Sequence, residues 1–242
     1  MATNSPLQIA IWGTGRAGRT RSRDVEASEA CALVAAESMR DKVSPDTIGD
    51  PSVDAVIICT ENARHYPLAK AALLAGKHVA VEYPLCQTAA QARELYELAH
   101  ESSLTLHVEV ISLLSQGYRD FSAALGSAPG PVELSSHFAG GSYRWVAEEI
   151  RAGRLSQLAL GRLYVVASLV PDLEVVDAAC QRGQDAYSWT ARLVAGNTTV
   201  RLSEQRAPDM SRGWELKAIV GDRELKMQRT SRLQPRRKIL QM

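Results

Sequence analysis

The sequence predicts an α/β protein with two domains: a doubly wound parallel sheet, followed by an α+β domain with a mainly antiparallel sheet. Three patterns predict this fold class. A glycine-rich turn directly follows an apolar strand near the N-terminus. Strand and helix patterns then alternate over the first 110 residues, as a parallel sheet with crossover helices requires. Beyond them, strand-like segments separated by Gly-Asn and Gly-Asp turns are typical of antiparallel hairpins.

The N-terminal turn is the segment GTGRAG, which follows the predicted strand at residues 7–12. Its glycines have the G-x-G-x-x-G spacing of a dinucleotide-binding turn. Gly13 permits the sharp bend, Gly15 lets the backbone approach a pyrophosphate, and Gly18 lets the next helix pack closely. The free N–H groups and the dipole at the start of that helix favour phosphate. The predicted phosphate contacts are Gly13, Gly15, Arg16, Ala17 and Gly18.

The end of the second strand, predicted at residues 31–38, selects the cofactor. The residue there normally meets the adenosine ribose: a carboxylate selects NAD, whereas serine and arginine accommodate the 2′-phosphate of NADP. This strand end contains both kinds of group: the carboxylate of Glu37, and the serine and arginine at Ser38 and Arg40. Because two of the three suit the phosphate, we expect NADPH, with NADH as the alternative.

The next two strands of the parallel sheet are predicted at residues 53–60 and 78–84. Their carboxyl ends supply further candidate cofactor contacts, since open α/β sheets bind ligands at that edge. These candidates are Thr60, Glu61, Asn62 and Glu82, together with His65 near the start of the intervening helix, which is either a cofactor contact or a surface residue. The remaining elements are helices at 19–28, 63–75 and 88–101 and a strand at 104–110. The first of these helices is basic. Its arginines Arg19, Arg21 and Arg23 either help to hold phosphate near the glycine turn or form a solvated face, and we favour the solvated face.

Size and charge limit the classes of function. The chain of 242 residues has a formal net charge of +1, which predicts neither nucleic acid nor an anionic membrane as a partner. Its four cysteines include no C-x-x-C pair, so we expect reduced thiols, no disulfide framework and no metal site. No apolar run could cross a bilayer, and the N-terminus lacks a signal-peptide layout. We expect a cytoplasmic protein acting on a small molecule.

The second domain is predicted to begin at the Gly- and Pro-rich loop that follows a helix at residues 111–125, so the expected domains are 1–125 and 126–242. Its predicted strands are 132–141, 175–180, 187–196, 198–206, 214–221 and 223–229, with helices at 145–155 and 158–169. An open sheet of this kind leaves one face free. That face is a candidate surface for a homo-oligomer, a partner chain or a wall of the substrate cleft. The closing basic run at 229–238 is interpreted as a solvated tail.

The segments GTGRAG, AGKHVAVEYPL (75–85) and TLHVE (105–109) resemble the glucose-fructose oxidoreductase-like (Gfo/Idh/MocA) dehydrogenases. Most members carry Glu-Lys-Pro where this chain has Glu82-Tyr83-Pro84. This tripeptide and the RxRD sequence after the turn resemble the biliverdin reductases within that family, as does the segment at 160–178. The resemblance implies a Rossmann fold. It also implies hydride transfer from NAD(P)H to an unsaturated carbon of a conjugated, carboxylate-bearing substrate such as biliverdin.

Three residues are candidates for the chemistry. Tyr83 follows a parallel strand, where its phenol can donate a proton or simply shape the pocket. Glu109 can act as an acid if it is desolvated, or as a structural hydrogen-bond acceptor. Arg162 can bind a substrate carboxylate through its guanidinium fork or form a structural ion pair. Glu82 contacts the cofactor or orients Tyr83.

Two departures from the biliverdin reductase pattern keep other functions open. Relatives continue the strand as His-x-Glu-His-x-Glu-Leu-Leu, whereas here His107 and Glu109 are followed by Val110, Ile111 and Ser112, so that two polar groups of that pattern are missing. An imine or ketone reductase of a specialised pathway is therefore a second hypothesis. The chain also ends in RTSRLQPRRKILQM where relatives carry further helices, so we expect those helices to be dispensable or replaced by a partner chain. A non-catalytic dinucleotide-binding protein is the third hypothesis.

Overall fold

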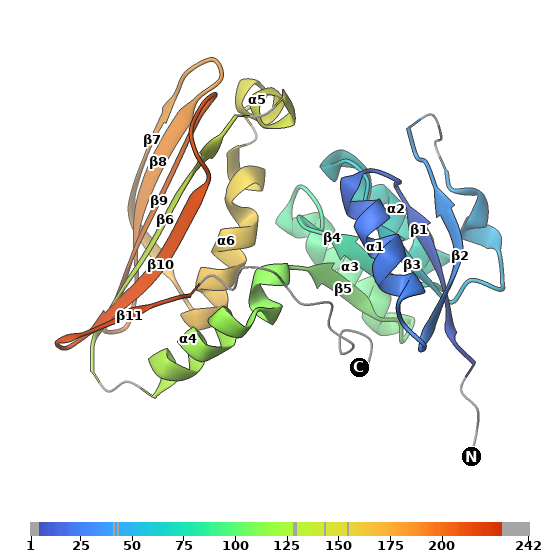
Figure 1. Ribbon diagram of the computed structural model, residues 1–242, viewed down its shortest axis with the longest axis horizontal. Helices are drawn as coiled ribbons and strands as arrows, with labels where there is room; N and C mark the ends of the chain where they lie inside the picture. The colour runs from blue at the N-terminus through green and yellow to red at the C-terminus, as the bar shows by residue number, and fades with distance from the viewer. Residues whose placement is uncertain are drawn as a thin grey trace. The chain divides into compact units, whose positions relative to one another are not determined.

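The structure is a computed structural model that describes residues 5–40, 42, 44–127, 130–142, 144–153 and 155–228 (Figure 1). Within these ranges the chain forms two compact units, the first ending at Val110 and the second beginning at Ile111. Each unit has its own sheet and its own hydrophobic core.

The first unit is built on a five-stranded parallel sheet with the strand order β2-β1-β3-β4-β5. Its strands are β1 (Leu7–Trp12), β2 (Cys31–Glu37), β3 (Ala55–Ile58), β4 (His78–Glu82) and β5 (Leu106–Glu109). Its helices are α1 (Arg16–Glu26), α2 (Asn62–Leu74), α3 (Ala89–Glu101) and the short 3-10 helix η1 (Asp46–Gly49). The strand order reverses at β1, which has β2 on one side and β3 on the other. The carboxyl ends of β1 and β3 therefore form the switch point where open α/β sheets bind ligands.

Alternation along β1 explains why helices cover both faces of this sheet. Ile9 and Ile11 pack with Val25 of α1, whereas Ala10 and Trp12 belong to the core that α2 and α3 complete. A central parallel strand buried on both faces has to be apolar at every position, as IAIW is. The predicted doubly wound sheet is confirmed.

The second unit is built on a six-stranded sheet with the order β11-β10-β6-β9-β8-β7. Only β6 and β9 pair in parallel, so the sheet is mainly antiparallel, as predicted. Its strands are β6 (Val132–Gly141), β7 (Glu174–Arg182), β8 (Tyr187–Ala195), β9 (Thr198–Ala207), β10 (Gly213–Val220) and β11 (Arg223–Lys226). Its helices are η2 (Ile111–Leu114), α4 (Gln116–Gly126), α5 (Arg144–Arg151) and α6 (Leu155–Leu169).

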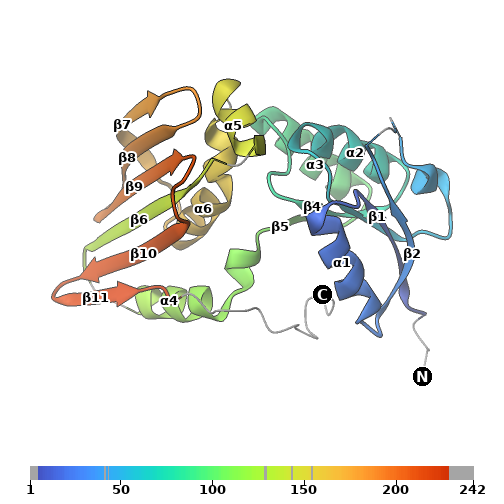
Figure 2. The same cartoon turned by 45° about the horizontal axis from the view of Figure 1, so that its top comes forward.

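One face of this second sheet is covered by helix and the other is open (Figure 2). Leu134 on β6 and Val200 on β9 are buried with Val166 of α6. Their neighbours point the other way: Glu133 and Arg201 are exposed and form an ion pair of 3.3 Å. Period-two burial of this kind is typical of an antiparallel sheet with one solvated face.

The boundary between the units lies earlier than the predicted boundary after residue 125. The predicted helix at 111–125 is a 3-10 turn followed by α4, because the Ser115 hydroxyl accepts a hydrogen bond of 3.1 Å from the Tyr118 N–H and caps α4 there. Phe121 of α4 is buried in the second core. A Cβ atom on Gly117 would overlap the carbonyl oxygen of Gln228. Helix α4 therefore packs with the second sheet rather than the first.

Several further predictions concern metals, membranes and thiols. Over the described ranges, no helix is long and apolar enough to span a membrane. Within the same ranges, no group of three or more His, Cys, Asp or Glu residues is arranged to hold a metal ion. The four cysteines are free: Cys31, Cys59 and Cys86 are buried and Cys180 is exposed. The basic run at 229–238 lies outside the described residues.

Candidate active site

The glycine turn follows β1 at the switch point of the parallel sheet. Gly13 has a φ of +108°, and its N–H donates to the carbonyl oxygen of Glu37 at 2.8 Å. A Cβ atom on Gly13 would overlap the carbonyl oxygen of Cys59, and one on Gly18 would overlap the carbonyl oxygen of Gly13. Two of the three glycines are thus required by the close contact of backbone with backbone.

The third glycine, Gly15, faces open space. Among the described residues, no atom lies within 4 Å of the position that its Cβ would occupy. Gly15 is the N-cap of α1, no side chain caps this helix, and its first turn contains no acidic residue. Backbone N–H groups left without acceptors at a helix N-terminus form a ready site for phosphate. A dinucleotide pyrophosphate fits here, where Gly15, Arg16 and Ala17 would hold it.

Glu37, at the end of β2, is buried and used by the fold. Its carboxylate accepts hydrogen bonds from the backbone N–H groups of Asp46 (2.7 Å) and Thr47 (3.0 Å) at the start of η1. Burial alone would raise the pKa of Glu37, but these bonds and the Thr47 hydroxyl together lower it below its ordinary value. We therefore correct the prediction that Glu37 receives the ribose, because its oxygens are already engaged. Ser38 and Arg40 are exposed beside it.

His65 is also a structural residue rather than the predicted cofactor contact. It is 1% exposed, and its two ring nitrogens lie 2.6 Å from the Pro84 carbonyl oxygen and 3.1 Å from that of Thr60. The ring thus ties the segment after β3 to the segment after β4. Thr60, Glu61 and Asn62 occupy the carboxyl edge of the sheet, with Glu61 as the N-cap of α2. Their contact with cofactor stays a prediction.

A charged network joins α1 to the carboxyl ends of β4 and β5. Glu82 and Glu109 are register partners on these strands. One nitrogen of Arg21 lies 3.0 Å from a Glu82 oxygen and 3.5 Å from a Glu109 oxygen, and the other terminal nitrogen lies 3.1 Å from Asp24. His107 lies 3.3 Å from the second oxygen of Glu109. The interpretation of Arg21 as part of a solvated face is wrong, because its side chain is only 14% exposed.

The helical period contains the signal for Arg21. Gly18 and Val25 are the buried residues of α1, seven positions apart, and Arg21 lies between them on the same face. A cation on the buried face of a helix is stable only when it is paired with a buried anion. The two glutamates at the ends of β4 and β5 are such anions, so the network could have been predicted from the sequence.

The two carboxylates of this network differ in their surroundings. Burial raises the pKa of Glu82; Arg21 opposes the rise and Glu109 adds to it. The hydrogen bond with His107 lowers the pKa of Glu109 despite its burial, and Arg21 lowers it further. Tyr83 directly follows Glu82, and its side chain is 38% exposed. An exposed phenol beside buried charges at the ligand-binding edge of the sheet is suited to contact a substrate.

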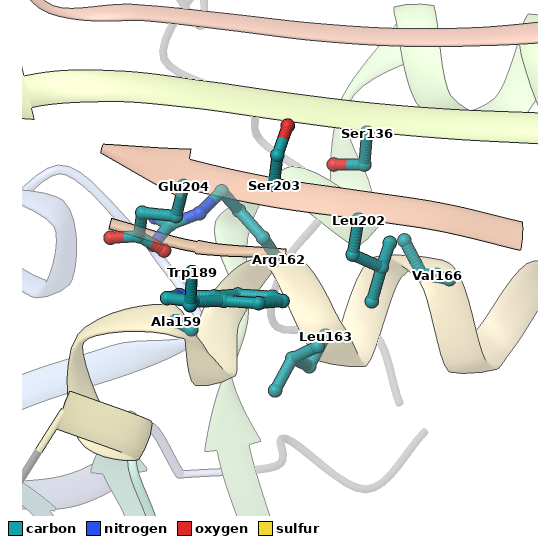
Figure 3. Close-up of a pocket in the computed structure, with 9 residues that line it drawn as sticks. All are labelled: Ser136, Ala159, Arg162, Leu163, Val166, Trp189, Leu202, Ser203 and Glu204. Atoms are coloured by element: carbon teal, nitrogen blue, oxygen red, sulfur yellow. The ribbon is translucent and has the colours of Figure 1, made fainter. Parts of the chain in front are cut away.

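Arg162 lies in the second unit, where it reaches from α6 toward Glu204 on β9 (Figure 3). It forms an ion pair with Glu204, which is fully buried, and its guanidinium stacks 3.9 Å from the centre of the Phe138 ring. Glu204 also accepts hydrogen bonds from Arg206 at 2.8 Å and from the Tyr187 hydroxyl. The cavity beside Arg162 has room for about one water molecule. We therefore correct the substrate-anchor prediction: the structure favours the structural ion pair.

Fold and turn together define a class, since a doubly wound sheet with a glycine turn at its switch point is the architecture of dinucleotide-binding enzymes. The family model described as an oxidoreductase family with an NAD-binding Rossmann fold matches residues 7–110. Biliverdin reductase A of Mus musculus is 30% identical over 222 residues, which cover 84% of this chain and 72% of that protein. The chain belongs to this Gfo/Idh/MocA oxidoreductase family, as a biliverdin reductase-like member.

Other relatives agree with this assignment. Biliverdin reductase A of Homo sapiens is 31% identical over 196 residues, which cover 74% of this chain and 64% of that protein. The crystal structure of biliverdin reductase from Synechocystis sp. PCC 6803, in complex with biliverdin and NADP+, superposes with a TM-score of 0.77 at 26% identity, covering 95% of this chain and 86% of that one. A probable dehydrogenase from Thermotoga maritima, 16% identical, has the same fold, with a TM-score of 0.77 and coverage of 91% and 75%.

Proposed function

We propose that this oxidoreductase uses NADPH to deliver a hydride to an unsaturated carbon of a conjugated, carboxylate-bearing substrate of the biliverdin type. One observation carries the proposal. Glu82-Tyr83-Pro84 ends β4 at the ligand-binding edge of the sheet, with the Tyr83 side chain 38% exposed, in a chain 30% identical to mouse biliverdin reductase A. The lysine usual in the wider family is absent at this position, so a phenol takes its place.

When bound, the nicotinamide cofactor supplies the hydride. The new C–H bond displaces the electron pair of a substrate double bond onto the conjugated atom at its far end, and that atom takes up one proton. The chain therefore has to orient the substrate and provide a proton at that atom. We assign the proton donation to the Tyr83 hydroxyl. We propose that Glu82 and Glu109, which are register partners at the ends of β4 and β5, provide charged groups near that hydroxyl.

The preference for NADPH is supported by the end of β2. Glu37 directs its carboxylate to the backbone of η1, so it is not free to accept a hydrogen bond from the 2′-hydroxyl of the adenosine ribose, which NADH has and NADPH carries as a phosphate ester. Ser38 and Arg40 are exposed at the same strand end. A hydroxyl and a guanidinium can both donate to a 2′-phosphate.

The test mixes the purified protein with biliverdin and either NADPH or NADH and follows the absorbance of both reactants. We expect turnover, with a higher kcat/KM for NADPH. Tyr83→Phe keeps the ring and removes the hydroxyl, so kcat is expected to fall by about a hundredfold or more if the phenol donates the proton. Tyr96→Phe, on an exposed part of α3, is the matched control.

Each outcome decides between hypotheses. No turnover of biliverdin with either cofactor overturns the bilin proposal. If a panel of imines and ketones is reduced instead, the protein is a reductase of that class. Tight binding of NADPH without reduction of any substrate points to a non-catalytic dinucleotide-binding protein. An unchanged kcat for Tyr83→Phe removes the phenol from the chemistry.

A further inference from the structure

Helix α1 carries a cation that the dinucleotide turn does not require. Arg21 lies one turn after Gly18, and its guanidinium reaches the carboxylates at the ends of β4 and β5. Its Nε donates to Glu82 at 3.1 Å, and a terminal nitrogen of the same guanidinium lies between Glu82 and Glu109. One side chain therefore connects the helix that starts at the glycine turn with two further strands of the sheet.

We propose that Arg21 is a positioning residue for hydride transfer: it holds Glu82 and Glu109 side by side and ionised, and so fixes the end of β4 from which Tyr83 projects. This inference rests on the proposed function. Arg21 acts through the two glutamates and is not assigned any contact with substrate or cofactor.

The charges around Arg21 explain why a cation is needed there. Glu82 and Glu109 are neighbours in register, so their carboxylates repel each other when both are ionised. Both side chains are mostly shielded from water, with exposed fractions of 19% and 11%, so the repulsion is weakly screened. A guanidinium is planar and has five donors, which allows it to bind two carboxylates at once.

Other groups around the two glutamates have to be counted before a pH effect is predicted. Asp24 on α1 forms an ion pair with Arg21, and His107 on β5 contacts Glu109. His65 on α2 lowers the pKa of Glu82. Burial raises the pKa of the thiol of Cys59, which directly follows β3, and the charges of Glu82, Arg21 and Glu109 also act on it. Within the described residues, Arg21 is the cation that contacts both glutamates.

The experiment compares Arg21→Met with Arg23→Met in the full chain. Both changes remove one positive charge from α1, but Arg23 is exposed, so its variant is the matched control. For Arg21→Met we expect kcat with NADPH and biliverdin to fall about tenfold, while the Kd for NADPH changes less than about threefold. Carboxyl carbon NMR on the cofactor-free protein gives a second readout. There the titration midpoints of Glu82 and Glu109 are expected to rise by about one pH unit or more, since a neighbouring cation shifts a carboxyl by that amount.

Arg21→Lys keeps the charge without the fork, so we expect a smaller fall in kcat and a smaller shift of the midpoints. It decides the matter if Arg21→Met does not fold. Unchanged midpoints in the Arg21 variants overturn the contact with the glutamates. Shifted midpoints with unchanged kcat overturn the positioning role. A loss of NADPH affinity equal to the loss of kcat assigns Arg21 to cofactor binding and overturns the proposal.

Failure of the proposed function gives a different result. In that case the unaltered protein itself does not reduce biliverdin, and the catalytic part of the inference is overturned with it, whereas the NMR titration still reports whether Arg21 holds the two carboxyls. If the inference alone fails, the unaltered protein still reduces biliverdin, and the Arg21 variants give one of the contrary outcomes described above.

Discussion

Glu37, Glu82 and Glu109 each end a strand of the parallel sheet, yet their hydrogen-bond donors give them different roles. Glu37 accepts from two backbone N–H groups, which cannot leave without unwinding η1. Glu82 and Glu109 instead share the side chain of Arg21, and no backbone N–H group of a helix is involved in that contact. A carboxylate that caps a helix is part of the fold. Two carboxylates that are held by the side chain of one arginine can change their protonation state without loss of backbone hydrogen bonds.

The same distinction applies to Arg162 and gives a test at the level of one residue. Arg162→Met removes one of two guanidinium groups from the buried Glu204 and leaves Arg206 as its partner. Breaking a buried ion pair leaves a poorly compensated charge, so we expect the free energy of unfolding to fall by about 3 kcal/mol in urea titrations. The KM for biliverdin is expected to stay within about threefold of the unaltered value.

An exposed ion pair provides the control for Arg162. Arg201→Met removes the partner of Glu133 on the open face of the second sheet, where we expect a loss of less than about 1 kcal/mol. If Arg162→Met instead keeps its stability and raises KM tenfold or more, Arg162 is the substrate anchor after all and the structural interpretation fails.

Elements of the first unit were well predicted because their sequence patterns are local. The apolar run at β1 and the glycine spacing place the strand and the turn correctly, and the helix predicted at 19–28 is found at Arg16–Glu26. In contrast, η1 and η2 were not predicted, because each depends on a contact distant in sequence or on a cap: Glu37 captures the start of η1, and Ser115 begins a new helix after η2. The pairing of Arg162 with Glu204 joins residues 42 positions apart, and no periodicity predicts such a pair.

The glycine turn allows a prediction at the level of an element, because its glycines serve different ends. Gly15→Ala places a methyl group in open space, so we expect a fold of nearly unchanged stability with NADPH binding weakened at least about tenfold. Gly18→Ala places a methyl group on the Gly13 carbonyl oxygen, so we expect partial or complete unfolding. Circular dichroism melts and NADPH titrations measure the two effects. Equal stability losses in the two variants would contradict this division of roles.

Over the described residues, each unit buries its apolar side chains in clusters of its own, which are built from one continuous part of the chain. The core residues of the first unit lie between Ile9 and Val108, and those of the second between Leu113 and Met227. The glycine turn and the Arg21 network belong to the first unit, whereas the Arg162 cluster belongs to the second. Oligomerisation through the open face of the second sheet and a cytoplasmic location stay predictions.

Separate cores predict that cofactor binding stabilises the chain unevenly. A ligand present at a hundred times its Kd stabilises the structure that binds it by about 2.7 kcal/mol. NADPH held at the glycine turn should therefore slow hydrogen exchange in the slowest amides of β1 and of its neighbours β2 and β3 far more than in β8, β9 and β10. Hydrogen-exchange mass spectrometry with and without NADPH measures this difference, and Gly15→Ala, which weakens binding without disturbing the sheet, should reduce it at the same NADPH concentration. Equal protection of both sheets would contradict this prediction, because it would mean that the two units unfold together and that the cofactor stabilises both to the same extent.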